Sequence, residues 1–303
     1  MKKLVIFLLF ITISISLLSV TNGALNGKFT IDAQGNQVVF SQGNLQYKAS
    51  ADTWRFAKNQ YDTIGSRNSN ISDSYTGWID LFGWGTGDNP TKTDVNEYTY
   101  TTFKDWGENP ISNGGDEPNQ WRTLTFLEWV YILHTRPNCV NLRGKATVNN
   151  VRGYILLPDE WSLPKDLHFT PDPADWTTNT YYADEWQEME ESGAVLLVAA
   201  GFRFGVDNVG LFGDWVMYWS STPIDEYAAG CVGFFNNFEN TQNARSNGEA
   251  VRLVQDLSPT ATAIQSPVVE KNSQSTATKH IKDGHVYILS GEQMYNTIGQ
   301  QVY

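Results

Sequence analysis

The stretch that decides the fold runs from Gly193 to Thr222. It begins with the apolar run Ala194-Val-Leu-Leu-Val-Ala-Ala-Gly201, continues through a loop rich in glycine, aspartate and asparagine, and ends with Tyr218-Trp-Ser-Ser-Thr222. An apolar run this short, stopped by glycine and followed by turn residues, favours a buried strand over a helix. In the last part, alternation places Trp219 and Ser221 on one face of a strand and Tyr218 on the other. The stretch therefore predicts two core strands joined by a loop.

Shorter strands are predicted on both sides of this centre. Alternating runs separated by turn residues predict a β meander near the start of the chain and further strands after it. The predicted strands cover residues 28–32, 37–41, 44–47, 53–56, 153–157, 227–235 and 250–254, and the polar residues 236–248 are predicted to form a loop.

Two helices complete the predicted core. Thr125 and Glu128 are spaced as a capping box, in which each side chain accepts a hydrogen bond from the other residue's backbone amide. An apolar stripe follows, before Arg136 and Pro137 end the helix; it consists of Phe126, Trp129, Val130 and Leu133. A second, shorter helix is predicted from an Asp184 cap, with Gln187 at the box position, to Gly193.

The segments without a periodic pattern differ in their aromatic content. Residues 57–120 are rich in small polar residues but carry many aromatic rings, so we predict an ordered, loop-rich insertion. Residues 257–280 are rich in Ser, Thr, Ala, Gln and Lys, which predicts a flexible linker. Residues 281–303 are predicted to form a short hairpin-like tail, too small to fold stably alone.

Residues 1–24 have the three regions of a Sec signal peptide. Two lysines are followed by an apolar run from Leu4 to Leu18 and then by small residues up to Ala24. We therefore expect the mature protein to be exported to the cell envelope or beyond. No cysteine lies near the cleavage site, so a lipoprotein anchor is not expected.

Charge, hydropathy and cysteine content limit the kinds of partner, membrane segment and metal site that we expect. The 303-residue chain has a formal net charge of −12, and a surface this acidic repels phosphate backbones, so nucleic acid is not expected as a partner. No later apolar run approaches the roughly 18 residues of a membrane span. Cys139 and Cys231 match no metal-ligand spacing, and they form either a disulfide or two separate buried thiols.

Several motifs, taken in order, resemble those of a family of bacterial secreted proteins. They are Leu124-Thr-Phe-Leu-Glu-Trp129, Leu157-Pro-Asp-Glu-Trp161, Glu185-Trp186, Ala199-Ala-Gly-Phe-Arg203, Tyr218-Trp-Ser-Ser-Thr222 and Ala250-Val-Arg-Leu-Val254. Residues 25–256 thus resemble the Fibrobacter-type major paralogous domain, which is similar in turn to the C-type-lectin-like fold of formylglycine-generating proteins. The resemblance implies an α+β domain with two helices on a twisted, mostly antiparallel sheet and long loops. The tail resembles short C-terminal segments of secreted proteins from anaerobic gut-type bacteria, some of them sorting signals.

The residues predict no metal and no cofactor. Glu117-Pro-Asn119 copies the calcium- and sugar-binding tripeptide of C-type lectins, but it lies before the first helix instead of after both, which favours an ordinary turn. The copper site of the formylglycine-generating enzymes needs a cysteine pair late in the chain, and here only Cys231 lies late.

No catalytic residue is assigned either. The carboxylates between Asp184 and Glu191 are interpreted as a solvated helix face, since nothing places two of them across one cleft as a glycosidase requires. The four histidines form no cluster, and the chain has no phosphate loop and no nucleophile elbow.

Two sets of residues remain as site candidates. Arg203 and Arg252 lie beside apolar runs and are predicted to form structural ion pairs with Asp159 or Glu160, with ligand contact as the alternative. Loops 205–215 and 236–247 carry side chains that suit sugar recognition but equally suit plain turns. The candidate ligand-binding residues there are the turn Val206-Asp207-Asn208, Asp214, Trp215, Asn236 and Asn237.

Together these patterns predict an exported, non-catalytic binding protein with a C-type-lectin-like core. Its expected partner is a glycan or a surface protein, bound through the loops after the central strands. A structural or adhesin-type component of the cell surface is one alternative, and a carbohydrate-active or formylglycine-generating-like enzyme is the other.

Overall fold

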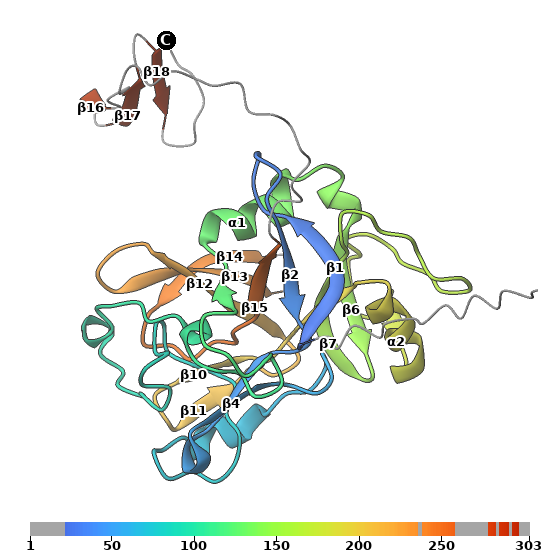
Figure 1. Cartoon of the computed structure of the whole chain (residues 1–303), viewed down its shortest axis with the longest axis horizontal. Helices are drawn as coiled ribbons and strands as arrows, with labels where there is room; N and C mark the ends of the chain where they lie inside the picture. The colour runs from blue at the N-terminus through green and yellow to red at the C-terminus, as the bar shows by residue number, and fades with distance from the viewer. Residues whose placement is uncertain (1–21, 236–237, 258–277, 283–284, 291–292, 297–303) are drawn as a thin grey trace, which may run out of the picture. The chain divides into compact units, whose positions relative to one another are not determined.

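The computed structural model describes residues 22–235, 238–257, 278–282, 285–290 and 293–296 (Figure 1). The chain divides into two compact units, residues 1–259 and 260–303. The first unit is a mixed α+β structure with few helices and mostly antiparallel strands, as predicted. Its strands form several small sheets instead of one sheet. Residues 1–21, which hold most of the predicted signal peptide, lie outside the described residues.

One sheet brings the two ends of the first unit together. Its order is β1–β2–β15–β5, formed by Ala24–Thr30, Gln37–Ser41, Leu253–Leu257 and Arg122–Thr123. β15 lies antiparallel beside β2, so the closing strand of the unit pairs with its second strand (Figure 1). This closing strand begins at Leu253, later than predicted.

The predicted meander is wrong only at the step from its second strand to its third. β2 pairs with β1 and β15, and it does not continue into β3 (Leu45–Lys48). Instead β3 pairs with β4 (Thr53–Phe56) in a separate two-stranded hairpin. The runs were therefore located correctly and form two local hairpins, but the second neighbour of β2 is β15, from a distant part of the chain.

A second sheet contains the central apolar run. Its order is β8–β6–β7–β9, formed by Thr180–Tyr181, Arg143–Val148, Val151–Leu156 and Val195–Val198. The run is a fully buried strand, β9, as predicted. β6 was missed; it joins β7 through Asn149 and Asn150, whose φ angles of 46° and 67° are a conformation that asparagine tolerates in tight hairpins.

A third sheet separates two hydrophobic cores. It consists of β12 (Trp215–Pro223), β13 (Ala228–Phe235) and β14 (Phe238–Ala244). Val216 and Tyr218 of β12 pack into one core, and Met217 and Trp219 pack into the other, so the predicted alternation is confirmed. The predicted loop is wrong over β14, which is an edge strand with a polar sequence and hence without an apolar alternation to reveal it.

The first helix confirms its predicted cap. α1 (Phe126–Val130) begins after Thr125, whose hydroxyl accepts from the Glu128 amide while the Glu128 carboxylate accepts from the Thr125 amide. A π-helical turn continues it through Tyr131–Thr135. Trp129 and Leu133 of the predicted stripe are buried in the first core.

The second helix begins earlier than predicted. α2 (Ala183–Glu191) has Tyr182 at its N-cap, and the Glu185 carboxylate accepts from the Tyr182 amide at 2.7 Å. The predicted pair of Asp184 and Gln187 is therefore wrong by two residues. The Glu185 carboxylate satisfies the free backbone amide of Tyr182, so the helix begins after Tyr182 and Asp184 lies inside its first turn.

Residues 57–120 are loops and short turns pinned by buried rings. Phe82, Trp84, Tyr100 and Trp106 are each at most 2% exposed. Further along, β10 (Phe202–Phe204) and β11 (Asn208–Gly210) form a hairpin. The 3₁₀ segments of the unit are Ala49–Ala51, Gly65–Asn70, Glu97–Thr99, Trp106–Glu108 and Cys139–Asn141.

The second unit is a small antiparallel sheet of three strands, β16 (Thr278–Lys282), β17 (His285–Ser290) and β18 (Gln293–Asn296). It has one strand more than the predicted hairpin, because β16 begins inside the predicted linker. Residues 258–277 of that linker lie outside the described residues.

Both cysteines are free, buried thiols, which selects one of the two predicted alternatives. Cys139 lies in a 3₁₀ turn, and Cys231 lies in β13 facing the second core. Burial raises the pKa of the Cys231 thiol well above its usual range. We expect a thiol-directed reagent to label neither cysteine in the native protein and both in denaturant without reductant. Mass spectrometry of the labelled chain checks this, and a disulfide would leave both thiols unlabelled in denaturant.

Candidate ligand-binding cleft

The predicted loop residues that the structure describes lie on the surface in two separate places. Asp207 and Asn208 are exposed in the β10–β11 hairpin, and Val206 packs partly against the second core. Asp214 forms a surface ion pair with Arg152 at 3.0 Å. Because that carboxylate already has a partner, it is not a free ligand-binding group.

The remaining residues of the predicted site, Trp215, Asn236 and Asn237, add no further ligand-binding group to the described surface. The half-buried ring of Trp215 stacks on Phe202, with ring centroids 5.9 Å apart, and so braces the start of β12. Asn236 and Asn237 lie outside the described residues.

The predicted ion pairs of Arg203 and Arg252 with Asp159 or Glu160 are wrong. Asp159 pairs with Arg136, whose Nη1 lies 2.9 Å from Oδ1. Arg136 reaches it because its Nη2 also donates to the Leu157 carbonyl at 2.7 Å, two residues before Asp159. Glu160 lines a small hollow of about 210 Å³ together with Asp159.

Arg252 is buried among neutral oxygens. Its Nη2 donates to Gln60 Oε1 at 2.6 Å, and its Nη1 lies 3.4 Å from Asn44 Oδ1. Gln60 Nε2 in turn donates to Glu190 Oε2 at 2.9 Å, so the carboxylate is linked to the arginine only through an amide. Burial lowers the pKa of Arg252 to about 10 and raises the pKa of Glu190. The interpretation of the 184–191 carboxylates as a solvated face is therefore wrong for Glu190.

The tripeptide Glu117-Pro-Asn119 forms a turn. Asn119 has a φ of 62°, and its amide donates to the Gly107 carbonyl at 2.9 Å. Across the described residues, no group of three or more His, Cys, Asp or Glu side chains is arranged to hold a metal ion.

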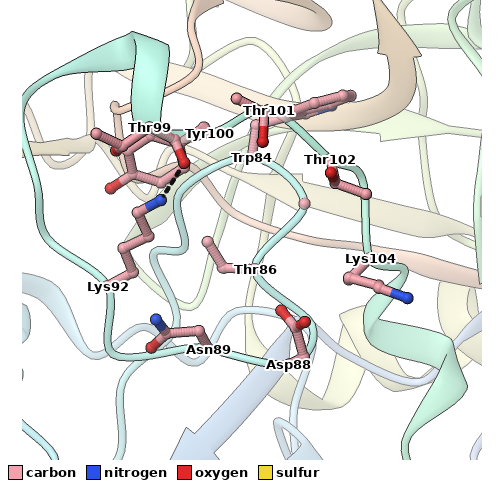
Figure 2. Close-up of a pocket in the computed structure, with 11 residues that line it drawn as sticks. Trp84, Thr86, Asp88, Asn89, Lys92, Thr99, Tyr100, Thr101, Thr102 and Lys104 are labelled. Carbon is pink, nitrogen blue, oxygen red and sulfur yellow. Dashed lines mark hydrogen bonds between the residues drawn. The ribbon is translucent and has the colours of Figure 1, made fainter.

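The structure instead shows an open polar cleft in the loop-rich region 57–120 (Figure 2). Its volume is about 520 Å³. We call it the threonine cleft, and its lining residues are Trp84, Gly85, Thr86, Asp88, Asn89, Lys92, Thr99, Tyr100, Thr101, Thr102 and Lys104. Apart from the two rings and the glycine, every lining side chain carries a hydroxyl, amide, carboxylate or ammonium group.

Backbone bonds hold the two sides of the threonine cleft together. Thr86 and Lys104 form a parallel bridge, in which the Lys104 amide donates to the Gly85 carbonyl at 3.1 Å. Gly85 has a φ of 66°, and a Cβ there would lie 2.7 Å from the Phe103 Cα. Glycine is required at this position both by its conformation and by the close approach of the chain.

Arg245 braces the cleft from behind. Its guanidinium stacks on Trp84, with Cζ 4.4 Å from the ring centroid, and its Nη1 donates to the Tyr100 carbonyl at 2.8 Å. Its Nη2 donates to the carbonyl of Asp225, in the turn between β12 and β13. One buried side chain therefore connects two lining residues to this turn.

An exposed aromatic pair extends this surface. Tyr98 precedes the lining residue Thr99 and is 56% exposed, and Tyr227 follows the β12–β13 turn and is 47% exposed. The two rings contact edge to face, with centroids 6.3 Å apart. The Tyr227 carbonyl also accepts from the Arg245 amide at 2.9 Å, so the pair is tied to the cleft by the same arginine.

The threonine cleft combines many hydrogen-bonding groups with nearby aromatic rings. The lining residues include one carboxylate, Asp88, the two ammonium groups of Lys92 and Lys104, and several hydroxyl groups. They provide many hydrogen-bond donors and acceptors next to exposed rings.

Comparison of the chain with family models, with curated proteins and with solved structures finds no match in any of the three. Of the helices that the structure describes, none is long and apolar enough to cross a membrane. The function of the cleft therefore has to be argued from its own geometry.

The cleft residues were missing from the predicted site. The segments Trp84-Gly-Thr-Gly-Asp-Asn89 and Thr99-Tyr-Thr-Thr102 carry a signal that could have found them, namely a buried ring with exposed polar residues close to it in sequence. Tyr100 lies between exposed threonines, and Trp84 is followed within five residues by exposed Asp88 and Asn89. A turn that served only to reverse the chain would not need a ring anchored on each side.

Proposed function

We propose that this protein is an exported, non-catalytic binding protein that recognises saccharides through the threonine cleft. The observation that carries the proposal is an open polar cleft of about 520 Å³ tied to an exposed aromatic pair, Tyr98 and Tyr227. Saccharides present hydroxyl groups that need paired donors and acceptors, and C–H faces that pack on aromatic rings. The cleft provides the first and the tyrosines provide the second.

The order of motifs along residues 25–256 supports a C-type-lectin-like fold as part of this proposal. So do the two helices, the antiparallel sheets and the long ordered loops. The signal-peptide pattern of residues 1–24 supports export, which would bring the cleft into contact with extracellular or envelope glycans.

The test replaces the aromatic pair. We expect the double variant Tyr98→Ala/Tyr227→Ala to lose about tenfold or more in affinity for the saccharide that the parent protein selects from a glycan array. Because both rings are exposed, the melting temperature should change by no more than about 2 °C. Titration calorimetry and a thermal melt measure the two effects.

Tyr182→Ala is the matched control. Tyr182 is 70% exposed and lies at the start of α2, away from the cleft residues in sequence. Its loss should leave affinity unchanged. A parent protein that binds no saccharide on the array would contradict the proposal, and unchanged affinity in the double variant would show that the saccharide binds elsewhere.

A further inference from the structure

Positively charged side chains surround the threonine cleft, although the chain as a whole has a net charge of −12. Figure 2 shows Lys92 and Lys104 on opposite sides of the cleft, with Asp88 and Asn89 along its lower edge. Asp88 is the only carboxylate among the lining residues. The sign of the local charge is therefore opposite to that of the protein.

The ammonium group of Lys92 is fixed in place. Its Nζ donates to the Thr99 carbonyl at 2.5 Å and lies 3.9 Å from the centroid of the Tyr100 ring. Neither of these two partners carries a negative charge. The carboxylates of Asp94 and Asp88 offset part of the Lys92 charge, but neither forms an ion pair with it in the described structure.

Two buried arginines add to the positive potential behind the cleft. Arg203 is 0% exposed and donates to backbone carbonyls, among them Gly205 at 2.8 Å and Lys92 at 3.4 Å, while its Nε has no partner in the described structure. Arg245 is 6% exposed and also donates to carbonyls, including that of the lining residue Tyr100. Burial lowers the pKa of Arg203 to about 10, yet it stays charged at neutral pH.

The carboxylate that acts on Arg245 is more strongly screened by solvent than the buried guanidinium groups. The Asp225 carboxylate, which acts on Arg245, lies at the surface. Charges in water are screened within about 10 Å, whereas buried charges are screened much less. The buried arginines are therefore screened less than this surface carboxylate.

The exposed edge of the cleft is suited to receive an oxyanion. Thr101, Thr102 and Lys104 are exposed lining residues from one short segment. Hydroxyl and ammonium groups are donors that bind carboxylate and sulfate oxygens, and the long lysine stem lets the ammonium adjust its position. Asp88 and Asn89, along the lower edge of the cleft in Figure 2, can accept hydrogen bonds from sugar hydroxyls, which a bare anion lacks.

From this geometry we infer that the threonine cleft selects acidic saccharides, holding a carboxylate or sulfate group at Lys104, Thr101 and Thr102 while Asp88 and Asn89 bind neighbouring hydroxyls. This inference rests on the proposed saccharide binding. It adds that the negative charge of the ligand, and not only its hydroxyls and ring faces, determines affinity.

The test compares charged and uncharged forms of one saccharide on the full exported chain. Oligogalacturonate and its methyl ester differ in the carboxylate charge and in one methyl group per carboxyl, and a sulfated galactan and its desulfated form differ only in sulfate. We expect the charged form of at least one pair to bind about tenfold or more tightly than its neutral form, since charge-assisted hydrogen bonds are lost with the charge. The pair that shows the difference identifies the anion.

Lys104→Glu should abolish this preference, because it replaces the cation at the proposed anion position with a carboxylate. Lys58→Glu is the control, because Lys58 is an exposed lysine outside the cleft and the substitution changes the net charge equally. Asp88→Asn should tighten binding of the charged form.

The outcomes separate this inference from the proposed function. Equal binding of charged and neutral forms, or an unchanged preference in Lys104→Glu, would overturn the anionic selectivity and leave saccharide binding intact. Binding of no form in either pair, with no glycan retained on the array, would overturn both.

Discussion

The Glu249→Gln variant is expected to be more stable than the parent protein at pH 9 and about equally stable at pH 5. Glu249 is 0% exposed, its Oε1 accepts from Asn243 Nδ2 at 2.6 Å, and its Oε2 has no partner within the described structure. Burial raises the pKa of this carboxyl to about 8, so the folded protein holds it neutral at physiological pH. A buried carboxylate with one amide donor is costly to ionise.

The direction of the pH dependence follows from proton binding. In the unfolded chain this carboxyl ionises near 4.5, whereas in the folded protein it keeps its proton up to about pH 8. Between these values the folded state binds more protons, so the parent protein loses stability as the pH rises from about 4.5 to 8, and this loss is complete above pH 8. The full loss is on the order of 3–5 kcal/mol in the free energy of unfolding.

Glutamine removes this contribution because its amide does not ionise. It keeps the oxygen that accepts from Asn243, and its NH₂ takes the place of the unpartnered Oε2. Urea denaturation of both proteins at pH 5, 7 and 9 measures the difference. Glu226→Gln is the control, since Glu226 is an exposed carboxylate of the same type. Parallel pH profiles for the parent and Glu249→Gln would show that Glu249 ionises normally in the folded protein.

Asp80 contributes in the same direction but over a lower range. It is 1% exposed, it is bonded to Asn68 Nδ2 at 2.8 Å, and burial raises its pKa to about 6. The parent protein and the Glu249→Gln variant both contain Asp80. The difference between their stability–pH profiles therefore reports on Glu249 alone.

Elements with a strong local pattern could be predicted from the sequence. The strand at Val195–Val198 is an unbroken buried run, β12 alternates its side chains between two cores, and the cap of α1 lies within four consecutive residues. In each case the information lies in neighbouring positions, which is what periodicity and capping rules use.

Elements stabilised by distant partners could not be predicted in the same way. β14 is a polar edge strand whose pairing is made by the backbone, and β2 pairs with β15 from the other end of the unit. Whether Asp159 pairs with Arg136, Arg203 or Arg252 depends on which guanidinium the fold brings within reach. Spacing along the chain carries little information about such a choice.

The threonine cleft illustrates the same limit. Loop residues such as Asn208 and Asp214 have the composition expected of a sugar site, yet the cavity lies in the earlier region where Gly85 and Lys104 are joined by the backbone. Composition indicates which residues can bind a saccharide. Only the packing of Trp84 and Tyr100 against Arg245 determines where several of them meet.

Gln60→Ala is expected to destabilise the protein by about 3–5 kcal/mol, because one amide supports four other groups in the core. Gln60 Oε1 accepts from Arg252 Nη2 at 2.6 Å and from the Leu196 amide at 2.8 Å. Its Nε2 donates to Glu190 Oε2 and to the Ala194 carbonyl, each at 2.9 Å. Truncation would leave a buried cation and a buried amide without their acceptor. Urea denaturation at pH 7 measures the loss.

The double variant Gln60→Ala/Arg252→Met distinguishes the orphaned charge from lost packing. If the unpaired arginine causes most of the loss, removing it as well should make the double variant less destabilised than the sum of the single variants by at least about 1 kcal/mol. Gln34→Ala, at an exposed turn, serves as the control and should change stability by less than about 0.5 kcal/mol. Strictly additive single losses would mean that Arg252 finds other acceptors, such as the Leu196 carbonyl 3.5 Å from its Nη1. Coupling would instead show that this neutral amide keeps a charged arginine in the core without a direct carboxylate partner.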